Sequence, residues 1–291
     1  MNYKSILILG KGYVGMRLFA YLHESKKQNK ISIKSRKDLN YHSKAVLSEY
    51  INANDIDLVI NCSGFTGRPN VDQCEKRKWD CWNLNVVVPT SINQACIETC
   101  TEYMHISSGC IYNGYKGVGR GWTEEDRPNF GLDNKSSFYS KSKHAFEELA
   151  KDCCILRVRM PFDDDFSERS YLSKILKYDN LINYVNSKTY IPDLCRFVDR
   201  LIVSGKMMKD VGIVNVVNPA AGDAVFVTDI LIHYGLENKR WSFVPLDDLD
   251  IVAPRSNCIL NTTKVDNMFS DFTMLSELQS LEQACSRYTT K

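Results

Sequence analysis

Short apolar runs alternate with amphipathic stretches through the first 160 residues of the chain. The apolar runs predict strands, and the stretches with apolar residues at helical spacing predict helices. The predicted strands are residues 4–9, 31–35, 58–62, 103–107 and 154–158, and the predicted helices are residues 16–23, 45–52, 71–101 and 137–151. This alternation is typical of a parallel sheet covered by helices on both faces. We therefore expect an α/β fold with a Rossmann-type, doubly wound parallel sheet.

The pattern changes after Pro161. The apolar spacing becomes mixed, with one further strand predicted at residues 213–217 and a helical tail from about residue 264. We therefore expect a dinucleotide-binding domain over residues 1–160 and a smaller substrate domain over residues 161–291. Within the first domain, Pro89 predicts a break or kink in the long helical stretch, and residues 109–135, rich in Gly, Asn, Asp and Pro, predict a long loop.

Composition excludes several classes of protein. The chain has 291 residues and a net charge of +2, which gives no electrostatic argument for nucleic acid or a membrane surface. No apolar run approaches the ~20 residues of a membrane helix, and the run at residues 6–9 is too short for a signal peptide. The 11 cysteines are scattered without paired C-x-x-C motifs, which favours reduced thiols in a cytoplasmic protein. No metal site is expected, and the run Asp163, Asp164 and Asp165 reads as a solvated loop because it lacks the spacing of calcium ligands.

The first strand leads into the sequence G-K-G-Y-V-G. A G-x-G-x-x-G turn between a strand and a helix is the fingerprint of dinucleotide binding, because its glycines let the pyrophosphate approach the helix N-terminus. An ordinary strand–helix turn is the alternative. The expected cofactor contacts here are Gly10, Lys11, Gly12, Tyr13, Val14 and Gly15, joined after the third strand by Ser63 and Gly64.

The end of the second strand favours NADPH over NADH. It reads Lys34-Ser35-Arg36-Lys37, and a basic residue at this point suits a 2′-phosphate. We expect Ser35 and Arg36 to contact the cofactor. The alternative is that these charges are only solvated and that Asp38 holds the ribose.

Tyr139 and Lys143 lie four residues apart on a predicted helix, and so on the same face. The Lys143 ammonium is expected to lower the pKa of Tyr139 from about 10. Such a Tyr donates a proton to a carbonyl oxygen as hydride arrives, and Ser108 supplies a second hydroxyl to that oxygen. Both Tyr139 and Lys143 are also expected to contact the cofactor.

These features resemble the extended short-chain dehydrogenase/reductases, and within them the plant-type UDP-4-keto-6-deoxy-glucose 3,5-epimerase/4-reductases that complete UDP-L-rhamnose synthesis. Composition does not separate a plant source from a giant-virus copy, which would work in the host cytoplasm. The plant-type glycine loop has one more residue between its first two glycines, which leaves the effect of the shorter loop on cofactor choice open. The matching motifs are G-F-T-G-R-P-N-V-D at 64–72, G-C-I at 109–111, P-N-F at 128–130, S-F-Y-S-K at 137–141, L-R-V-R-M-P at 156–161 and V-A-P-R-S-N at 252–257.

The resemblance implies roles for the matched positions. Ser108, Tyr139 and Lys143 would form the reductase set, and Cys110 and Lys174 the acid and base of epimerisation. Arg255 would meet the substrate diphosphate, and Asn85 would shape the helix beside the site. The full set expected to contact substrate is Thr66, Arg68, Asn70, Asn85, Arg159, Arg255 and Asn257.

The residue types fit both reactions. A ketone at C4 acidifies the protons on C3 and C5, so a base can remove one while donors stabilise the enolate. An acid on the opposite face of the ring then inverts the centre, and a thiol with an ordinary pKa near 8.5 can donate at neutral pH. A Lys acts as base only if burial or a neighbouring cation lowers its pKa. Without the resemblance, Cys110 reads as a small buried residue and Lys174 as a solvated helix residue.

Of Arg157 and Arg159, which alternate along a strand, one is expected to face the site and the other solvent or an ion pair. The expected reaction converts UDP-4-keto-6-deoxy-D-glucose and NADPH to UDP-L-rhamnose, with an upstream 4,6-dehydratase supplying the ketosugar. Two rivals stay open: a dTDP-4-keto-rhamnose reductase without epimerase activity, and a non-catalytic NADP-binding sensor. Family resemblance also implies a homodimer formed through helices near residues 85–101 and 138–151. The base preference, uridine or thymidine, and the order of C3 and C5 inversion are not set by the sequence.

Overall fold

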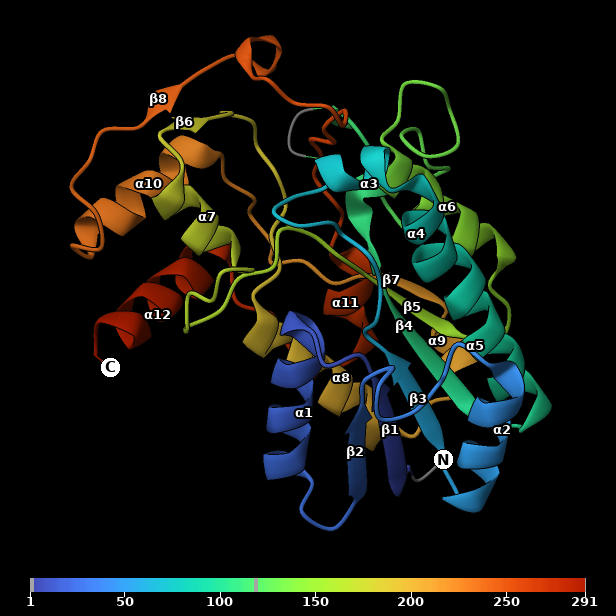
Figure 1. Cartoon of the computed structure of the whole chain (residues 1–291). Coiled ribbons are helices and arrows are strands. Elements are labelled where there is room, and N and C mark those ends of the chain that lie inside the picture. The colour runs from blue at the N-terminus through green and yellow to red at the C-terminus, as the bar shows by residue number, and fades with distance from the viewer. Residues whose placement is uncertain (1–2, 118–119, 291) are drawn as a thin grey trace.

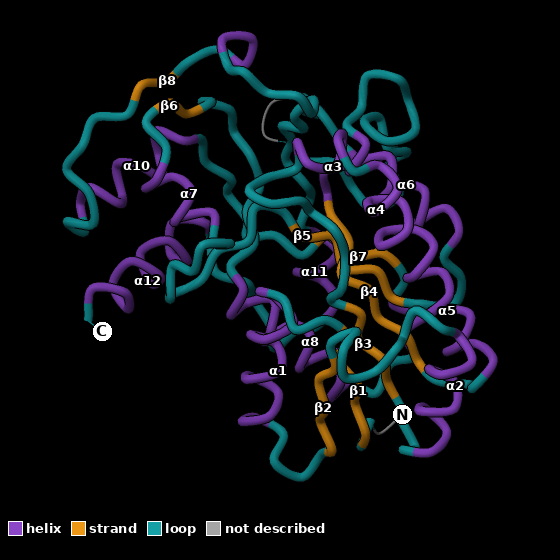
Figure 2. Tube along the Cα trace, viewed as in Figure 1, coloured by secondary structure: helices purple, strands orange, loops and turns teal. Residues whose placement is uncertain are grey.

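Six parallel strands form the central sheet of the protein in a computed structural model that describes residues 3–117 and 120–290 (Figures 1 and 2). The strand order is β2-β1-β3-β4-β5-β7. The strands are β1 (Ser5–Leu9), β2 (Lys30–Lys34), β3 (Leu58–Asn61), β4 (Glu102–Ser108), β5 (Cys154–Val158) and β7 (Ile213–Asn215). The expected Rossmann-type α/β fold is confirmed.

Helices cover both faces of this sheet. One face carries α1 (Tyr13–Ser25), α8 (Ile191–Ser204) and α11 (Thr263–Met268), and the other carries α2 (Lys44–Ala53), α5 (Val88–Glu98) and α6 (Phe138–Leu149). The strand β1 is an unbroken apolar run because both of its faces are buried. Ile6 and Ile8 enter the core of the first face, while Leu7 and Leu9 enter the core of the second.

A second group of elements lies beside the sheet (Figure 1, left). It has its own core, in which Leu172, Leu231 and Leu281 are fully buried. Its elements are α7 (Tyr171–Lys177), β6 (Asn180–Leu181), α10 (Ala224–His233), β8 (Ser242–Phe243) and α12 (Glu277–Thr289). Segments from beyond residue 160 complete the sheet, however, because α8 packs against α1 and β7 pairs with β5. The chain therefore enters the second group, returns to the sheet and leaves it again.

The long helical stretch at residues 71–101 is segmented. It consists of α3 (Asp72–Lys76), α4 (Lys78–Trp82), a π-helical turn (Asn83–Val87) and α5. The π-helical turn directly precedes α5, and Pro89 lies in the first turn of that helix, where its missing N–H costs no hydrogen bond. The irregularity expected at Pro89 therefore lies in the turn before it, and π-helical turns are frequent at functional sites.

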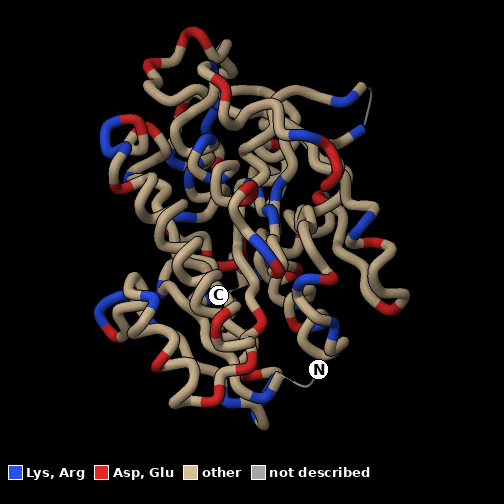
Figure 3. Tube along the Cα trace, turned by 90° about the vertical axis from the view of Figure 1, so that its right-hand side faces the viewer, with Lys and Arg blue, Asp and Glu red and all other residues tan. Residues whose placement is uncertain are grey.

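The predicted loop at residues 109–135 forms backbone hydrogen bonds with the C-terminal part of the chain. It begins with a 3₁₀ turn (Gly109–Ile111), and the N–H of Trp122 donates to the Ile259 carbonyl at 2.8 Å. The remaining short elements are α9 (Met208–Val211) and a 3₁₀ turn (Leu246–Asp248). Charges of both signs are interspersed along the chain in Figure 3. Among the described helices, none has the length and apolar character needed to cross a bilayer.

Candidate functional site

The glycine-rich turn between β1 and α1 has the shape of a phosphate cradle. Gly10 has φ +103°, and a Cβ there would lie 2.8 Å from the Ser63 backbone nitrogen. A Cβ on Gly15 would lie 2.1 Å from the Gly10 carbonyl oxygen, whereas one on Gly12 would meet open space. Gly12 caps α1 without a side-chain hydrogen bond, so the N–H groups of the first turn are left for a ligand. The backbone at this turn therefore fits a dinucleotide pyrophosphate, the group that the sequence predicts.

Asp38 closes the turn that follows β2. Its Oδ2 accepts hydrogen bonds from the Ser35 N–H and hydroxyl, both at 2.8 Å, and pairs with Lys11 Nζ at 2.9 Å. The Lys11 ammonium and the Ser35 donors hold the pKa of Asp38 well below its usual range. Arg36 is exposed. Burial raises the pKa of Tyr41, and the charge of Arg36 opposes this shift. Burial lowers the pKa of His42, and the charge of Arg36 lowers it further. Lys11 is therefore paired, whereas Arg36 makes no ion pair within the part of the chain that the structure describes.

The loop after β3 brings Gly64 to the helix α6. Ser63 donates to Asn61 Oδ1 from its N–H at 2.9 Å and from its hydroxyl at 2.6 Å. A Cβ on Gly64 would lie 3.7 Å from Lys143 Nζ. The turn that follows the third strand therefore lies against the Tyr139/Lys143 helix, as a shared cofactor site requires.

Ser108, Tyr139 and Lys143 are all buried at the point where β4 ends and α6 begins. Ser137 caps α6 through a hydrogen bond to the Ser140 N–H, which fixes the start of the helix. Lys143 Nζ lies 3.5 Å from the Ile106 carbonyl oxygen. Two segments distant in sequence, β4 and α6, thus bring two hydroxyls and the amine of Lys143 together.

The pKa expectation for Tyr139 is wrong. Burial and the nearby Cys110 raise the pKa of Tyr139 above its ordinary value, although a hydrogen bond with Ser108 acts in the opposite direction. Burial also lowers the pKa of Lys143 to about 8. Desolvation disfavours the charged form of each group, and it is the largest cause of both shifts. Tyr139 therefore stays protonated at neutral pH.

Glu147 ties α6 to the neighbouring strands β4 and β5. It accepts from the Ser107 hydroxyl at 2.6 Å and from Arg157 Nη2 at 2.7 Å, and both members of the ion pair are almost fully buried. Glu147 also acts to raise the pKa of Lys143, one helical turn away. The ion pair expected for one of the two strand arginines is thus made by Arg157.

Asn85 is committed to protein contacts. Its Oδ1 accepts from the Phe65 N–H at 2.7 Å, while its Nδ2 donates to the Phe65 carbonyl at 2.8 Å and to the Ser142 hydroxyl at 3.1 Å. The side chain projects from the π-helical turn and is fully buried. Asn85 therefore ties the loop after β3 to α6 and shapes the site rather than opening onto it.

Cys110 and Arg159 are neighbours. Arg159 Nη1 lies 3.7 Å from Cys110 Sγ and donates to the Ser256 hydroxyl at 2.9 Å, while Nη2 donates to Asn186 Oδ1 at 2.6 Å. Arg159 is 1% exposed, and its Nε has no partner among the described residues. A buried guanidinium is thus aimed at the thiol that the family resemblance assigns as an acid.

Lys174 lies on α7, and Arg169, just before this helix, contacts the loop that carries Thr66 and Arg68. Burial lowers the pKa of Lys174, and the positive charge of Arg169 lowers it further. Arg169 Nη1 donates to the Gly67 carbonyl at 3.0 Å and lies 3.5 Å from the Thr66 hydroxyl. Arg169 lies in the loop after β5 and carried no signal in the sequence. Asn70 accepts from the Asp72 N–H at 2.9 Å and so closes the same loop.

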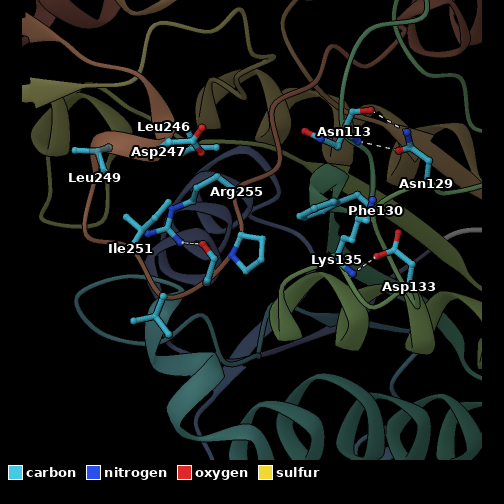
Figure 4. A pocket seen from close by; sticks show the side chains of 13 residues that line it. Asn113, Asn129, Phe130, Asp133, Lys135, Leu246, Asp247, Leu249, Ile251 and Arg255 are labelled. Carbon is cyan, nitrogen blue, oxygen red and sulfur yellow. Dashed lines mark hydrogen bonds between the residues drawn. The ribbon is translucent and has the colours of Figure 1, made fainter.

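A pocket of about 620 Å³ opens beside Arg255 (Figure 4). Arg255 and Ile251 lie on one side of it, and Asn113, Phe130 and Lys135 lie on the other. Its full lining is Asn113, Asn129, Phe130, Asp133, Lys135, Leu246, Asp247, Leu249, Ile251, Val252, Ala253, Pro254 and Arg255. The volume is in the range of small-molecule sites.

Arg255 and Asn257, both from the motif V-A-P-R-S-N, hold the Arg255 side of the pocket in place. Arg255 Nη1 pairs with Asp72 Oδ1 at 2.8 Å. Asn257 donates from its N–H to Asn113 Oδ1 at 2.9 Å, and its own Oδ1 accepts from Asn186 at 3.0 Å. Asp72, quoted only as part of a motif at the sequence level, is therefore a structural part of the pocket.

The expectation of a solvated loop at the aspartate run is wrong. Asp163 is buried and pairs with Arg17 of α1 at 2.7 Å, and Asp165 pairs with the same guanidinium. Asp164 pairs with Arg287 of α12 at 2.9 Å. Acidic side chains on this loop therefore join α1 to α12 of the second group of elements. Local sequence does not reveal this role.

The residues 4–193 match the family model described as RmlD substrate binding domain. The chain belongs to this family. It is 35% identical over 231 residues to a bifunctional dTDP-4-dehydrorhamnose 3,5-epimerase/dTDP-4-dehydrorhamnose reductase of Arabidopsis thaliana, covering 75% of this chain and 73% of that relative. It is also 35% identical over 235 residues to a trifunctional UDP-glucose 4,6-dehydratase/UDP-4-keto-6-deoxy-D-glucose 3,5-epimerase/UDP-4-keto-L-rhamnose-reductase of the same plant. That match covers 77% of this chain but only 34% of the trifunctional protein.

Two solved structures share the fold. The L780 UDP-rhamnose synthase of Acanthamoeba polyphaga mimivirus has a TM-score of 0.86 at 21% identity, covering 98% of this chain and 100% of its own. A dTDP-4-dehydrorhamnose reductase of Bacillus anthracis, solved in complex with NADP, has a TM-score of 0.78 at 18% identity, covering 100% and 99% of the two chains. The resemblance drawn from the motifs is thus confirmed at the level of the family.

Proposed function

We propose that this protein is an NADPH-dependent nucleotide-sugar 4-keto reductase that also epimerises its substrate. It would convert UDP-4-keto-6-deoxy-D-glucose to UDP-L-rhamnose. The observation that carries the proposal is the convergence of Ser108, Tyr139 and Lys143 with Cys110 at the point where β4 ends and α6 begins. A reductase needs the first three groups, and only an epimerase has use for a fourth proton donor there.

The cofactor would supply hydride to C4. The turn from Gly10 to Gly15, together with Ser35, Arg36, Ser63 and Gly64, would hold the dinucleotide, and Lys143 would contact its ribose. Exposed Arg36 offers a partner for the 2′-phosphate of NADPH that NADH lacks. The B. anthracis reductase bound to NADP supports this choice of cofactor.

Tyr139 would donate the proton that the C4 oxygen needs during reduction. Its raised pKa suits this direction, because the hydroxyl stays protonated until the strongly basic alkoxide forms. Ser108 Oγ, which already accepts from the Cys110 N–H at 3.2 Å, would donate to the same oxygen. The two hydroxyls would also stabilise an enolate at this oxygen.

Epimerisation would use Lys174 as base and Cys110 as acid. Neutral Lys174 would remove a proton from C3 or C5, and Cys110 would deliver one to the opposite face of the ring. Buried Arg159, 3.7 Å from the sulfur, would stabilise the thiolate that remains. The names of the two plant relatives, both of which include a 3,5-epimerase, support this part of the proposal.

The remaining candidate residues would hold the sugar and its nucleotide. Thr66, Arg68 and Asn70 would line the sugar end, and Arg255 would meet the diphosphate beside the 620 Å³ pocket, which would take the nucleoside. Asn85, Arg159 and Asn257 would position these groups through the contacts described above. Residues 161–291, apart from the segments that complete the sheet, would form the substrate domain.

The cellular setting is also a proposal. A 4,6-dehydratase must supply the ketosugar, and the trifunctional relative carries that activity in its name. The protein would act in the cytoplasm, and as a homodimer. Ile97 of α5 and Leu149 of α6 are 44% and 52% exposed, which would suit an apolar contact between two copies.

Two variants test the bifunctional assignment. Cys110→Ala and Lys174→Ala, given UDP-4-keto-6-deoxy-D-glucose and NADPH, should yield little UDP-L-rhamnose, since general acids and bases contribute ~10²–10⁴-fold. Both should still reduce a ketosugar already in the L-rhamno form. If both variants make UDP-L-rhamnose at the wild-type rate, the protein is a 4-reductase without epimerase activity. If the wild type oxidises no NADPH with either ketosugar, the reductase assignment fails as well.

A further inference from the structure

Arg169 occupies a position between two candidate parts of the site. It directly precedes Ser170, the N-cap of α7, and Lys174 lies about one turn further along that helix. Its Nη1 donates to the Gly67 carbonyl at 3.0 Å and lies 3.5 Å from the Thr66 hydroxyl. The guanidinium therefore spans from the start of α7 to the loop after β3.

The start of α7 is fixed by other contacts as well. The Tyr171 N–H donates to the Pro161 carbonyl at 2.9 Å, which ties the helix to the end of the strand that carries Arg159. The Lys174 N–H donates to the Ser170 carbonyl at 3.3 Å. These two hydrogen bonds fix the backbone of the first turn of α7, which separates Arg169 from Lys174.

We infer that Arg169 is the positioning residue for the base of epimerisation: it docks the loop at residues 66–67 on α7 and holds a second positive charge at the start of the helix that carries Lys174. This inference rests on the proposed epimerase function. It adds a residue to which neither the motifs nor the family resemblance gave a role.

The physical argument is electrostatic. Two like charges in a partly buried place disfavour each other, so Arg169, which stays charged in proteins, shifts the equilibrium of Lys174 toward the neutral form. Burial lowers the pKa of Lys174 and Arg169 lowers it further. The groups that face Arg169 itself are Arg68 from the loop after β3 and Glu168 from its own loop.

Two other lysines that contact α7 are paired. Lys188, whose Nζ lies over the Tyr171 ring, pairs with Glu277 at 2.8 Å. At the other end of the helix, Lys239 donates to the Leu176 carbonyl and pairs with Asp179 at 3.1 Å. The charge of Arg169 acts on Lys174, so its removal should change the protonation of Lys174.

The test is the pH dependence of proton exchange. The wild-type protein with NADP⁺, which cannot deliver hydride, is incubated with UDP-4-keto-6-deoxy-D-glucose in deuterated water, and deuterium incorporation at C3 and C5 is followed by NMR. Below the pKa of the base, the rate falls tenfold for each unit that the pKa rises. Arg169→Met should move the acidic limb of the rate profile to higher pH, with a loss of about tenfold at neutral pH and recovery toward the wild-type rate in alkaline buffer. Arg169→Lys, which keeps the charge, should retain most of the wild-type profile.

Two results would contradict these proposals. A loss of equal size at every pH in Arg169→Met, with no rescue by Arg169→Lys, would mean that Arg169 only anchors the loop, and would overturn the inference. No exchange by the wild type would instead remove the proposed epimerase function. The matched control is Arg200→Met, which removes from α8 a cation that is paired with Asp271. It should leave the profile unchanged. Reduction of the L-rhamno ketosugar reports that each variant is folded.

Discussion

Arg255 Nη1 lies 2.8 Å from Asp72 Oδ1, and this ion pair joins the two most specific sequence motifs of the chain. Asp72 ends G-F-T-G-R-P-N-V-D and begins α3, while Arg255 lies in V-A-P-R-S-N. Asp72 Oδ1 also accepts from the Ala253 N–H at 2.9 Å. The carboxylate thus fixes the backbone and the guanidinium of the pocket wall together.

Asp72→Asn should weaken substrate binding more than turnover. The amide cannot neutralise Arg255 or hold it in place, so KM for the nucleotide sugar should rise about tenfold while kcat changes little. Residues in direct contact typically couple by about 0.5–3 kcal/mol, which a double-mutant cycle with Arg255→Lys would measure. Asp80→Asn, which breaks an exposed pair with Arg77, is the matched control. A KM equal to that of the wild type would mean that the pair plays no part in binding.

The same pair has a defined pH dependence. Partial burial would raise the pKa of Asp72, but hydrogen bonds from Arg255 and the Ala253 N–H outweigh it and hold the pKa below its usual range. A carboxyl with a depressed pKa in the folded state stabilises the fold above its unfolded value of about 3.9. That contribution is lost as the pH falls through the lower, folded pKa. Thermal unfolding between pH 5 and pH 3 should therefore show a smaller acid-induced loss in Asp72→Asn than in the wild type.

Tyr139→Phe should abolish reduction and leave cofactor binding largely intact. The hydroxyl donates the proton, but the dinucleotide is held by the glycine turn and by Lys143. We expect the rate of NADPH oxidation to fall by ~10²–10⁴-fold, with the dissociation constant of NADPH within a few-fold of the wild type. Stopped-flow turnover and a fluorescence titration measure the two quantities separately. Turnover close to that of the wild type would exclude Tyr139 as the proton donor.

Lys143→Met should stabilise the protein while removing its activity. Burial lowers the pKa of Lys143 from 10.5 to about 8, so the charged form costs stability at neutral pH. The shift corresponds to about 3 kcal/mol at pH 7, fully present below pH 8. As the pH rises from 8 toward 10.5, the unfolded chain holds the proton that the folded protein releases, so wild-type stability rises and the advantage of the variant shrinks.

Urea unfolding at pH 7 and pH 9 checks this prediction. Lys151→Met, at an exposed position just beyond the same helix, should show no gain at either pH. An equal gain for Lys143→Met at both pH values would contradict the electrostatic explanation. It would point instead to better packing of the apolar side chain.

Arg36→Ala should weaken NADPH binding far more than NADH binding. The exposed guanidinium is free to pair with the 2′-phosphate, whereas neighbouring Lys11 is already paired with Asp38. Charged hydrogen bonds are worth about 1.5–3 kcal/mol, so the NADPH dissociation constant should rise by about 10- to 100-fold. Lys37→Ala is the matched control. An equal loss for both cofactors would reduce Arg36 to a surface charge.

Local sequence was enough to determine the strand–helix order, the glycine turn and the pairing of Tyr139 with Lys143 on one face of α6. Each of these depends on residues a few positions apart, where apolar spacing, backbone freedom and helical geometry act directly. The family motifs then indicated which side chains belong to the site. They did not indicate what those side chains touch.

Only the tertiary structure decided the protonation states of the site residues and the side chains that they contact. Burial, which no local pattern reveals, raises the pKa of Tyr139 where the charge of Lys143 alone predicts the opposite. The placement of Arg159 against Cys110, of Arg169 against Gly67 and of Asp72 against Arg255 joins segments far apart in the chain. Such contacts arise from how the sheet and the second group of elements pack together. For this reason the sequence supplied the chemical groups, and the fold determined their protonation and their geometry.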